Sequence, residues 1–211
     1  TAAQIAGGGA TQATLYTFEG AASTLSVSST GGVKLTDEVL TQATVTTADV
    51  SASNGVIHVI DKVLVPPGVL DIVQMAKLNP TFSVLVEAVV AANLANALSG
   101  AGPLTVFAPT NDAFTAALTE LSLTKAQLLA SPSLSGILTY HVVNGNVRAA
   151  DVVALPKPAS VATLQGSTFS VGTTLAITDG RTRVANLVAT DVIASNGVIH
   201  VIDKVLLPPI N

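Results

Sequence analysis

One stretch of sequence occurs twice in the chain and limits the folds that the chain can adopt. Ala52–Leu64 and Ala194–Leu206 are identical, and they lie 142 residues apart. Chance does not produce a match of this length, so the chain contains an internal repeat. The offset between the two copies is about the length of one domain.

The repeated stretch reads as a β-strand that follows a tight turn. In the later copy, Asn196-Gly197 is a turn dipeptide, because glycine adopts turn conformations at little steric cost. The next residues, Val198–Ile202, are mostly β-branched, and alternation puts apolar side chains on both faces. These features predict a central strand that is covered on both faces and is ended by Pro208-Pro209. The same interpretation applies to the earlier copy, Gly55–Pro67.

Composition narrows the classes of function. The 211 residues are enough for one large domain or one and a half ordinary ones, and a net charge of −4 argues against nucleic acid as a partner. Aromatic residues make up 3% of the chain and Trp is absent, which disfavours base-stacking and carbohydrate-binding surfaces. The absence of Cys excludes disulfides, thiolate metal sites and a Cys nucleophile.

The same composition bears on localisation. Only 10% of the residues are charged, and this composition fits secreted or cell-surface proteins. Thr1-Ala2-Ala3 is compatible with a preceding signal-peptide cleavage site. No apolar run approaches the roughly 20 residues of a membrane-spanning helix. The sequence therefore predicts an extracellular or surface location without a transmembrane segment.

Residues 1–67 are predicted to be rich in β-structure. The glycine run at Gly7–Gly9 indicates a turned or flexible start, and Gly31-Gly32 indicates a turn between strands. The predicted strands are Thr14–Phe18, Thr24–Ser28, Val33–Thr36 and Ala43–Thr47, ahead of the first copy of the repeat.

From Gly68 onwards apolar residues recur at helical spacing. The predicted helices lie at Val69–Leu78, Phe82–Leu98, Asp112–Leu118, Thr124–Leu129 and Ser133–Leu138. Leu104–Ala108 and Tyr140–Val143 are predicted strands, and after Ala150 the chain is predicted to be β again, at Val161–Leu164, Thr168–Val171, Thr174–Thr178 and Arg183–Val188. Helices followed by a run of strands predict an α+β fold with antiparallel sheets.

Three motifs in Gly68–Asn211 resemble the fasciclin domain family. Thr105–Phe114 resembles its first signature box, Tyr140-His141 resembles its Tyr-His motif, and Gly197–Pro209 resembles its second signature box, in the expected order. The resemblance implies a wedge-shaped β-sandwich decorated by helices. It also implies a secreted or surface adhesion module, often arranged in tandem.

Residues 1–67 resemble only the C-terminal half of such a domain, so the sequence predicts a half-domain at 1–67 and a complete domain at 68–211. A half-sandwich leaves one sheet face and its strand edges uncovered. Three explanations stay open. The chain was cut by processing or at a cloning boundary, or the half packs on the complete domain or a neighbouring chain as an assembly device, or it folds alone in a divergent way.

The resemblance also supplies candidate functional residues. The adhesion or ligand candidates are Leu138, Tyr140, His141 and Val142, although we expect the His141 ring to have mainly a structural role that ties strand to helix. The remaining motif positions are predicted to be mainly structural. They are Thr105, Phe107, Pro109, Thr110, Asn111, Asp112, Phe114, Gly197, His200, Asp203, His58 and Asp61.

Two of these positions, His58 and His200, are equivalent in the repeat. A ligand or pH-switch role is one interpretation, and a buried, hydrogen-bonded core histidine is the favoured one. Asp61 and Asp203 follow the histidines by three positions on the strand, so each Asp points to the opposite face and a direct pair is not expected. Asn111 and Asp112 are expected to serve a turn and a helix cap, and neither a metal nor a cofactor is predicted.

The leading functional interpretation is a non-enzymatic adhesion or matrix protein. It would act through contacts with other proteins or with copies of itself. Self-contact through the half-domain would build a homo-oligomer or polymer. The expected contact surfaces are the Tyr140-His141 region and the edges of the half-domain. An alternative is a binding protein for an apolar ligand of the carotenoid type, which the family resemblance permits. A remote alternative is an ester hydrolase, but no Gly-x-Ser-x-Gly elbow is present.

Overall fold

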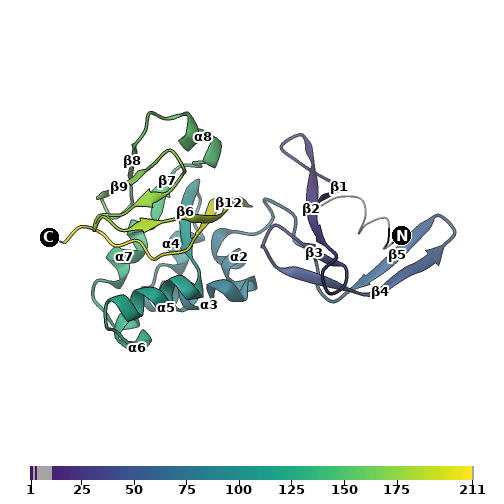
Figure 1. Cartoon of the computed structure of the whole chain (residues 1–211), viewed down its shortest axis with the longest axis horizontal. Helices are drawn as coiled ribbons and strands as arrows, with labels where there is room; N and C mark the ends of the chain where they lie inside the picture. Colours follow the sequence, from purple (N-terminus) through teal and green to yellow (C-terminus); the bar gives the residue numbers. More distant parts are fainter. Residues whose placement is uncertain (2, 4–10, 211) are drawn as a thin grey trace. The chain divides into compact units, whose positions relative to one another are not determined.

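The computed structural model of the chain describes residues 1, 3 and 11–210, so the glycine turn predicted at Gly7–Gly9 lies outside the described residues. The chain divides into two compact units, Thr1–Val69 and Leu70–Asn211. This division falls two residues after the one predicted from the sequence. Figure 1 shows the sheet of the first unit and the mixed helices and strands of the second.

The first unit is a five-stranded antiparallel sheet in the order β1-β2-β3-β4-β5. Its strands are β1 (Thr11–Phe18), β2 (Ala21–Ser28), β3 (Lys34–Thr36), β4 (Gln42–Ala52) and β5 (Gly55–Ile60). The strands predicted here are confirmed, although β4 runs on well beyond Thr47. The predicted turn is also confirmed, because Gly31 and Gly32 have φ angles of 72° and 109°, where glycine is favoured.

The earlier copy of the repeat is not the covered, central strand that the sequence predicts. It forms β5, which lies at the edge of its sheet and pairs only with β4 among the described residues. Val56, Ile57 and Val59 are 44%, 55% and 46% exposed. The prediction fails because, among residues 11–69, no strand lies beyond β5 and no helix covers its faces.

The second unit begins with a helical layer. Its helices are α2 (Ile72–Leu78), the 3₁₀ turn η1 (Pro80–Phe82), α3 (Ser83–Ala91), α4 (Ala95–Leu98), α5 (Asn111–Glu120), α6 (Lys125–Leu129), α7 (Leu134–Tyr140) and α8 (Ala149–Ala154). Local sequence explains several starts: Asp71 and Gln74 form a capping box on α2, as Thr124 and Gln127 do on α6.

Two helical predictions need correction. The stretch Phe82–Leu98 is not one helix, because Asn93 adopts a left-handed conformation with φ of 55° and separates α3 from α4. The chain is not purely β after Ala150 either, since Ala149–Ala154 forms α8. Asp151 accepts a hydrogen bond from the backbone N–H of Arg148 and so helps to begin this short helix.

The strands of the second unit form two four-stranded sheets. One has the order β11-β10-β9-β8 and the other β12-β13-β6-β7. The strands are β6 (Leu104–Pro109), β7 (Val142–Asn144), β8 (Ala159–Ala162), β9 (Thr168–Val171), β10 (Ile177–Thr178), β11 (Val184–Ala185), β12 (Leu187–Ala194) and β13 (Gly197–Ile202). The later copy of the repeat is β13, which is central and buried at every residue, as predicted.

Among the described strands, one pairing departs from the predicted antiparallel arrangement. β13 pairs with β6 in parallel, from Gly197 opposite Leu104 to Ile202 opposite Pro109. This pairing is long-range, so the local pattern of the sequence does not report its direction. β6 therefore links the helical part of the unit directly to the repeated strand.

An aromatic cluster joins the two sheets of the second unit. Phe169 of β9 makes edge-to-face contacts with Phe107 of β6 and with Tyr140 of α7, at ring-centroid distances of 5.1 and 6.1 Å. Ile177 and Ile202 are fully buried in the same cluster. Such contacts between rings add to the stabilisation from burial, so this core fixes the position of the β6–β13 pair.

Candidate functional site

The Tyr-His segment lies at the end of a helix and not in a strand. Tyr140 is the last residue of α7, His141 is its C-cap, and β7 begins only at Val142. The prediction of a strand over Tyr140–Val143 is therefore wrong for its first two residues. Their β-like sequence is overridden by the tertiary contacts that bury both side chains.

His141 ties helix α7 to the segment that follows β13. Its Nδ1 lies 2.8 Å from the carbonyl oxygen of Ile137, and its Nε2 accepts a hydrogen bond of 2.8 Å from the backbone N–H of Leu206. These partners fit the neutral ring with its proton on Nδ1. Burial lowers the pKa of His141 to about 4, because the charged ring would lose its hydration. The expected structural role of this ring is supported by both contacts.

Tyr140 is also built into the core. Its hydroxyl donates a hydrogen bond of 2.8 Å to the carbonyl oxygen of Thr168, and burial raises the pKa of the phenol. Leu138 and Val142 are buried as well. All four adhesion candidates thus lie inside the second unit, and a direct contact between them and a partner stays a prediction.

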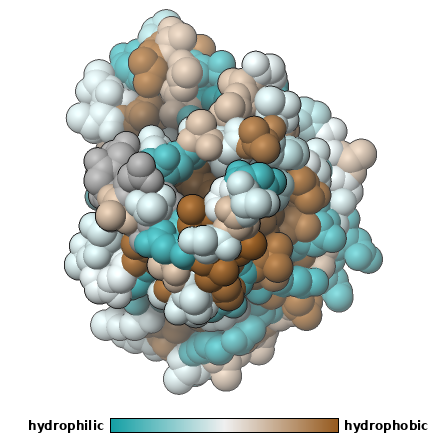
Figure 2. Space-filling model, turned by 90° about the vertical axis from the view of Figure 1, so that its right-hand side faces the viewer, coloured by the Kyte–Doolittle hydropathy of each residue, from teal (hydrophilic) through white to brown (hydrophobic). Residues whose placement is uncertain are grey.

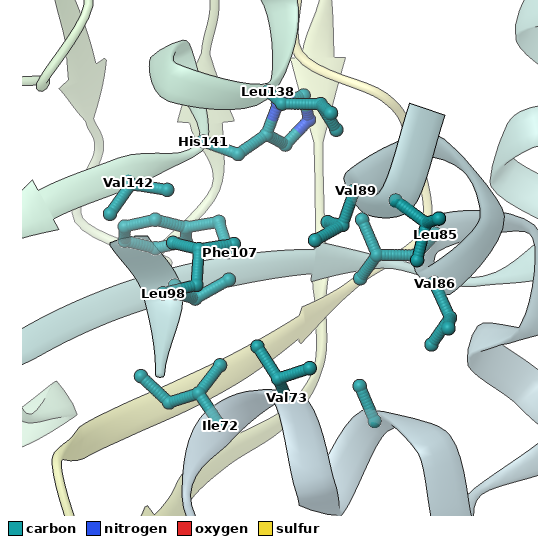
Figure 3. A pocket seen from close by; sticks show the side chains of 13 residues that line it. Ile72, Val73, Leu85, Val86, Val89, Leu98, Phe107, Leu138, His141 and Val142 are labelled. Atoms are coloured by element: carbon teal, nitrogen blue, oxygen red, sulfur yellow. The ribbon is translucent and has the colours of Figure 1, made fainter. Parts of the chain in front are cut away.

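An apolar hollow lies beside His141 (Figure 3). Ile72 and Val73 of α2 face Leu85, Val86 and Val89 of α3 across it, and Leu98, Phe107, Leu138, His141 and Val142 complete the labelled lining. Its volume is about 30 Å³. Sites for drug-sized molecules have volumes of about 300–1,000 Å³, so this hollow holds only a small part of an apolar ligand.

The first signature box supplies β6 and the start of α5. Thr105, Phe107, Pro109 and Phe114 are buried. The Thr105 hydroxyl donates to the carbonyl of Gly145 at 2.7 Å and accepts from the N–H of Val147 at 2.8 Å. These positions are therefore structural.

The polar residues of this box act as caps and links. Thr110 is the N-cap of α5 and accepts a hydrogen bond from the N–H of Ala113. Asn111 accepts from the N–H of Val84 and donates to the carbonyl of Pro80, which fastens α5 to η1 and α3. Asp112 is exposed in the first turn of α5, where a carboxylate suits the positive end of the helix dipole.

The two copies of the repeat form hairpins that share two side-chain contacts with the backbone. Asp61 accepts from the N–H of Thr44, and Asp203 from the N–H of Asn186, both at 2.7 Å. The ring Nδ1 of His58 accepts from the N–H of Asp49 at 3.3 Å, and that of His200 from Asp191 at 3.4 Å. In neither hairpin does the Asp carboxylate form a hydrogen bond with the His ring. This agrees with the expectation that the two side chains point to opposite faces of the strand.

The two histidines differ in their surroundings. His200 is 2% exposed, and its Nε2 lies 2.8 Å from the carbonyl oxygen of Val147, so the prediction of a core histidine is confirmed there. His58 is only partly buried, so the same prediction is wrong for the first copy. The physical reason is again that, among the described residues, β5 lacks the layers that cover β13.

Sequence reasoning missed a pair of buried carboxylates at equivalent positions, Asp37 and Asp179. Each accepts hydrogen bonds from three backbone N–H groups, those of Val39, Thr41 and Val65 in the first unit and of Arg181, Arg183 and Leu207 in the second. Asp179 also pairs with the Arg183 guanidinium at 2.8 Å. An alignment of the chain with itself at the 142-residue offset places the two acids together and is the signal that identifies them.

Neither a metal site nor a membrane-spanning helix is present in the described part of the chain. No group of three His, Cys, Asp or Glu residues there is placed to hold a metal ion. No helix among residues 1, 3 and 11–210 is long and apolar enough to cross a bilayer.

Comparison with known proteins identifies the family. The Fasciclin domain family matches residues 1–66 and again 80–208. The chain therefore belongs to the fasciclin domain family.

Several relatives and one solved structure are similar to the chain. Protein sll1483 of Synechocystis is 48% identical over 146 residues, which are 66% of this chain and 74% of that protein. The chain is 33% identical to human periostin over 74% of its own length, but this match spans only 18% of periostin. The FAS1 domain pair of the insect cell adhesion molecule fasciclin I has the same fold, with a TM-score of 0.64 at 22% identity over 88% of this chain and 67% of the insect chain.

Proposed function

We propose that the chain is a secreted or cell-surface adhesion or matrix module that acts through protein–protein contacts, with other proteins or with copies of itself, and not through catalysis. The observation that carries this proposal is the exposed apolar hairpin strand of the first unit. Val56, Ile57 and Val59 are about half exposed, and Val63 after them is 87% exposed. Contiguous exposed apolar surface marks interaction sites in soluble proteins.

The lack of charged residues on β5 supports the same proposal. Gly55–Ile60 contains no acidic residue, Lys or Arg, so the strand lacks the charges by which edge strands usually discourage association. Figure 2 shows hydrophobic residues at the surface between hydrophilic ones. Membership of a family that includes an insect cell adhesion molecule agrees with a role in contact.

A bead-clustering assay tests the proposal. Beads coated with the full chain are expected to cluster with one another, or to bind to a surface coated with matrix protein. Ile57→Lys places a charge on the exposed strand and should reduce this binding, while Val188→Lys, at a position 62% exposed on β12, should leave it unchanged. Wild-type beads that bind neither each other nor the matrix surface would contradict the proposal.

The apolar hollow favours a second candidate, the binding of an apolar ligand. Its lining is apolar except for the His141 ring. Because the hollow has a volume of about 30 Å³, it would take the end of an extended apolar molecule and not the whole of it. An absorbance spectrum of protein from its native source tests a carotenoid-type ligand: a visible band that survives gel filtration supports it, and a colourless protein contradicts it.

A further inference from the structure

The second unit contains two Asn-Gly dipeptides that the sequence alone does not distinguish. Asn196-Gly197 lies at the turn between β12 and β13, and Asn144-Gly145 lies at the end of β7. In such a dipeptide the backbone nitrogen of glycine can attack the side-chain carbonyl carbon of asparagine, because glycine has no Cβ to hinder the approach. The attack needs a side chain that is free to rotate and a backbone that is free to bend, so the fold decides which dipeptide reacts.

The side chain of Asn196 is held at both of its polar atoms. Its Oδ1 accepts a hydrogen bond of 3.0 Å from the N–H of Ile72. Its Nδ2 donates to the carbonyl oxygens of Leu98 and Gly100, at 2.8 and 3.0 Å. Gly197 is confined as well, because a Cβ there would lie 1.9 Å from a backbone carbonyl oxygen of β6. A reaction at this dipeptide therefore has to break three hydrogen bonds and displace a central strand.

The side chain of Asn144 is in a different environment. It is exposed, and its carboxamide has no hydrogen-bond partner among the described residues. A Cβ added to Gly145 would meet no atom within 4 Å, so there is space beside the backbone at this position.

Two hydrogen bonds restrain the peptide groups of Gly145. Its N–H donates to the carbonyl of Pro103 at 2.9 Å, and its carbonyl accepts from the hydroxyl of Thr105 at 2.7 Å. Only the first has to open before the nitrogen can attack. It lies at the end of a three-residue strand, where hydrogen bonds open most readily. The fold therefore slows a reaction at Asn144 but does not block it.

We propose that Asn144-Gly145 is a site of spontaneous covalent modification, at which Asn144 is converted to aspartate and isoaspartate, whereas Asn196-Gly197 is protected by the fold. Hydroxide removes the proton from the Gly145 N–H, and the nitrogen forms a bond to Cγ of Asn144. The bond from Cγ to the side-chain nitrogen breaks, and this nitrogen takes up a proton from water and leaves as ammonia. A five-membered succinimide ring remains. Water then opens one of the two C–N bonds of the ring, which gives either aspartate or isoaspartate.

The isoaspartyl product alters contacts of the core. In this product the main chain runs through the former side chain, so the backbone gains one atom just before Gly145. The next residues are fastened to the core at Val147, whose N–H donates to the hydroxyl of Thr105 and whose carbonyl oxygen lies 2.8 Å from Nε2 of His200. The extra atom therefore loosens the attachment of this segment to β6 and β13.

Ageing of the full chain at mildly alkaline pH tests the proposal. Trypsin places the two asparagines in separate peptides, 126–148 and 184–204, and mass spectrometry follows the replacement of the side-chain NH₂ by OH in each. Fragment ions distinguish Asn144 from Asn146 in the first peptide. In the folded chain Asn144 is expected to convert at least about tenfold faster than Asn196, because one hydrogen bond at a strand end opens more readily than three hydrogen bonds of a buried turn.

Unfolding the chain in urea provides the control for the dipeptide itself. Both asparagines then precede glycine in a flexible chain, so their rates should become similar and Asn144 should react faster than in the folded chain. Asn54-Gly55 of the first unit lies in a third peptide, 35–62, and does not enter this comparison.

Asn144→Gln is the matched variant. It keeps an exposed carboxamide, but attack on the longer side chain would have to form a six-membered ring, which is far slower. The mass increase at position 144 should be lost. Amide hydrogen exchange at Val147 should be faster in the aged wild type than in the aged variant, because only the wild type gains the extra backbone atom.

Several results would overturn the inference. Equal rates at Asn144 and Asn196 in the folded chain would remove the role of the fold, as would an unreacted Asn144 after a period in which the unfolded chain converts completely. A mass increase of peptide 126–148 that persists in Asn144→Gln would assign the modification to another residue. Unchanged exchange at Val147 in the converted chain would contradict the loosened attachment. None of these results bears on adhesion, so the proposed function is tested separately.

Discussion

The hairpins β4–β5 and β12–β13 compare one sequence in two environments. They share their register, the left-handed residue of the bulge at Asp49 and Asp191, and the hydrogen bonds from their Asp and His side chains. They differ in burial, from 55% exposed at Ile57 to 3% at the equivalent Ile199. The comparison teaches that the sequence of a hairpin specifies its internal geometry, whereas its energetic importance depends on what packs around it.

The largest expected difference is at the paired glycines. Gly197→Ala should destabilise the second unit by at least about 4 kcal/mol or prevent its folding, because backbone atoms of β6 obstruct the new Cβ and cannot rotate away. Gly55→Ala should change the stability of the first unit by no more than about 0.5 kcal/mol. Urea unfolding monitored by hydrogen exchange in each hairpin measures both changes in stability. Equal changes would contradict the expected difference between the two hairpins.

A smaller difference is expected at the paired isoleucines. Ile199→Ala removes a side chain that is 3% exposed and should cost about 3 kcal/mol through lost burial and the cavity left behind. Ile57→Ala changes a side chain that is 55% exposed and should cost less than about 1 kcal/mol. The same unfolding experiment applies, and a large loss at Ile57 would mean that the strand is covered in solution.

The pH dependence of stability should separate the two units. The folded pKa of His141, about 4, lies below the ordinary value near 6.5, so only the unfolded state takes up the proton as the pH falls between these values. The stability of the second unit is then complete above pH 6.5 and decreases by about 3 kcal/mol as the pH falls to 4. Thermal unfolding across this range measures the loss.

A substitution isolates the contribution of His141. His141→Gln keeps one donor and one acceptor but cannot titrate, so it should lower stability at neutral pH and flatten the curve between pH 6.5 and 4. A curve as steep as that of the wild type would assign the acid sensitivity to other groups. The first unit serves as an internal reference, because no copy of the Tyr-His segment occurs in residues 1–69.

The smallest expected difference is at the paired aspartates. Asp61→Ala and Asp203→Ala each remove a hydrogen bond of 2.7 Å from a backbone N–H at an exposed position, and Asp203→Ala also removes one of 2.8 Å from the Asn186 side-chain amide. The shared bond should contribute about 1 kcal/mol in each unit, and Asn186→Ala in the Asp203→Ala background separates the additional bond of the second unit. Similar losses would sharpen the comparison, since they would show that contacts within the hairpin are independent of the surrounding layers, whereas a loss confined to Asp203 would contradict this.

Much of the fold could be predicted because its signals are local. The turns at Gly31-Gly32 and Asn196-Gly197 and the strands β1 to β4 follow from the chemistry of neighbouring residues. The cap expected from Asn111 and Asp112 is supplied one residue earlier, by Thr110. The local pattern misassigns Tyr140 because its position at the end of a helix depends on longer-range packing. It misassigns Asn93 because one left-handed residue interrupts an otherwise helical apolar pattern. The Asp179–Arg183 pair is local, but its burial has no local signal because its further partners Leu207 and Val205 lie beyond β13.

The sequence by itself determined the repeat, the hairpin geometry of both copies and the membership of the family, since identity, alternation and turn residues are properties of the chain alone. Only the tertiary structure decided that β13 is a buried, central strand and that β5 is an exposed edge. The physical reason is that burial is not encoded in a strand but arises from the segments that pack against it, here β6 and the helices of the second unit. For the same reason the two identical strands differ in burial among the described residues, although their sequences are the same.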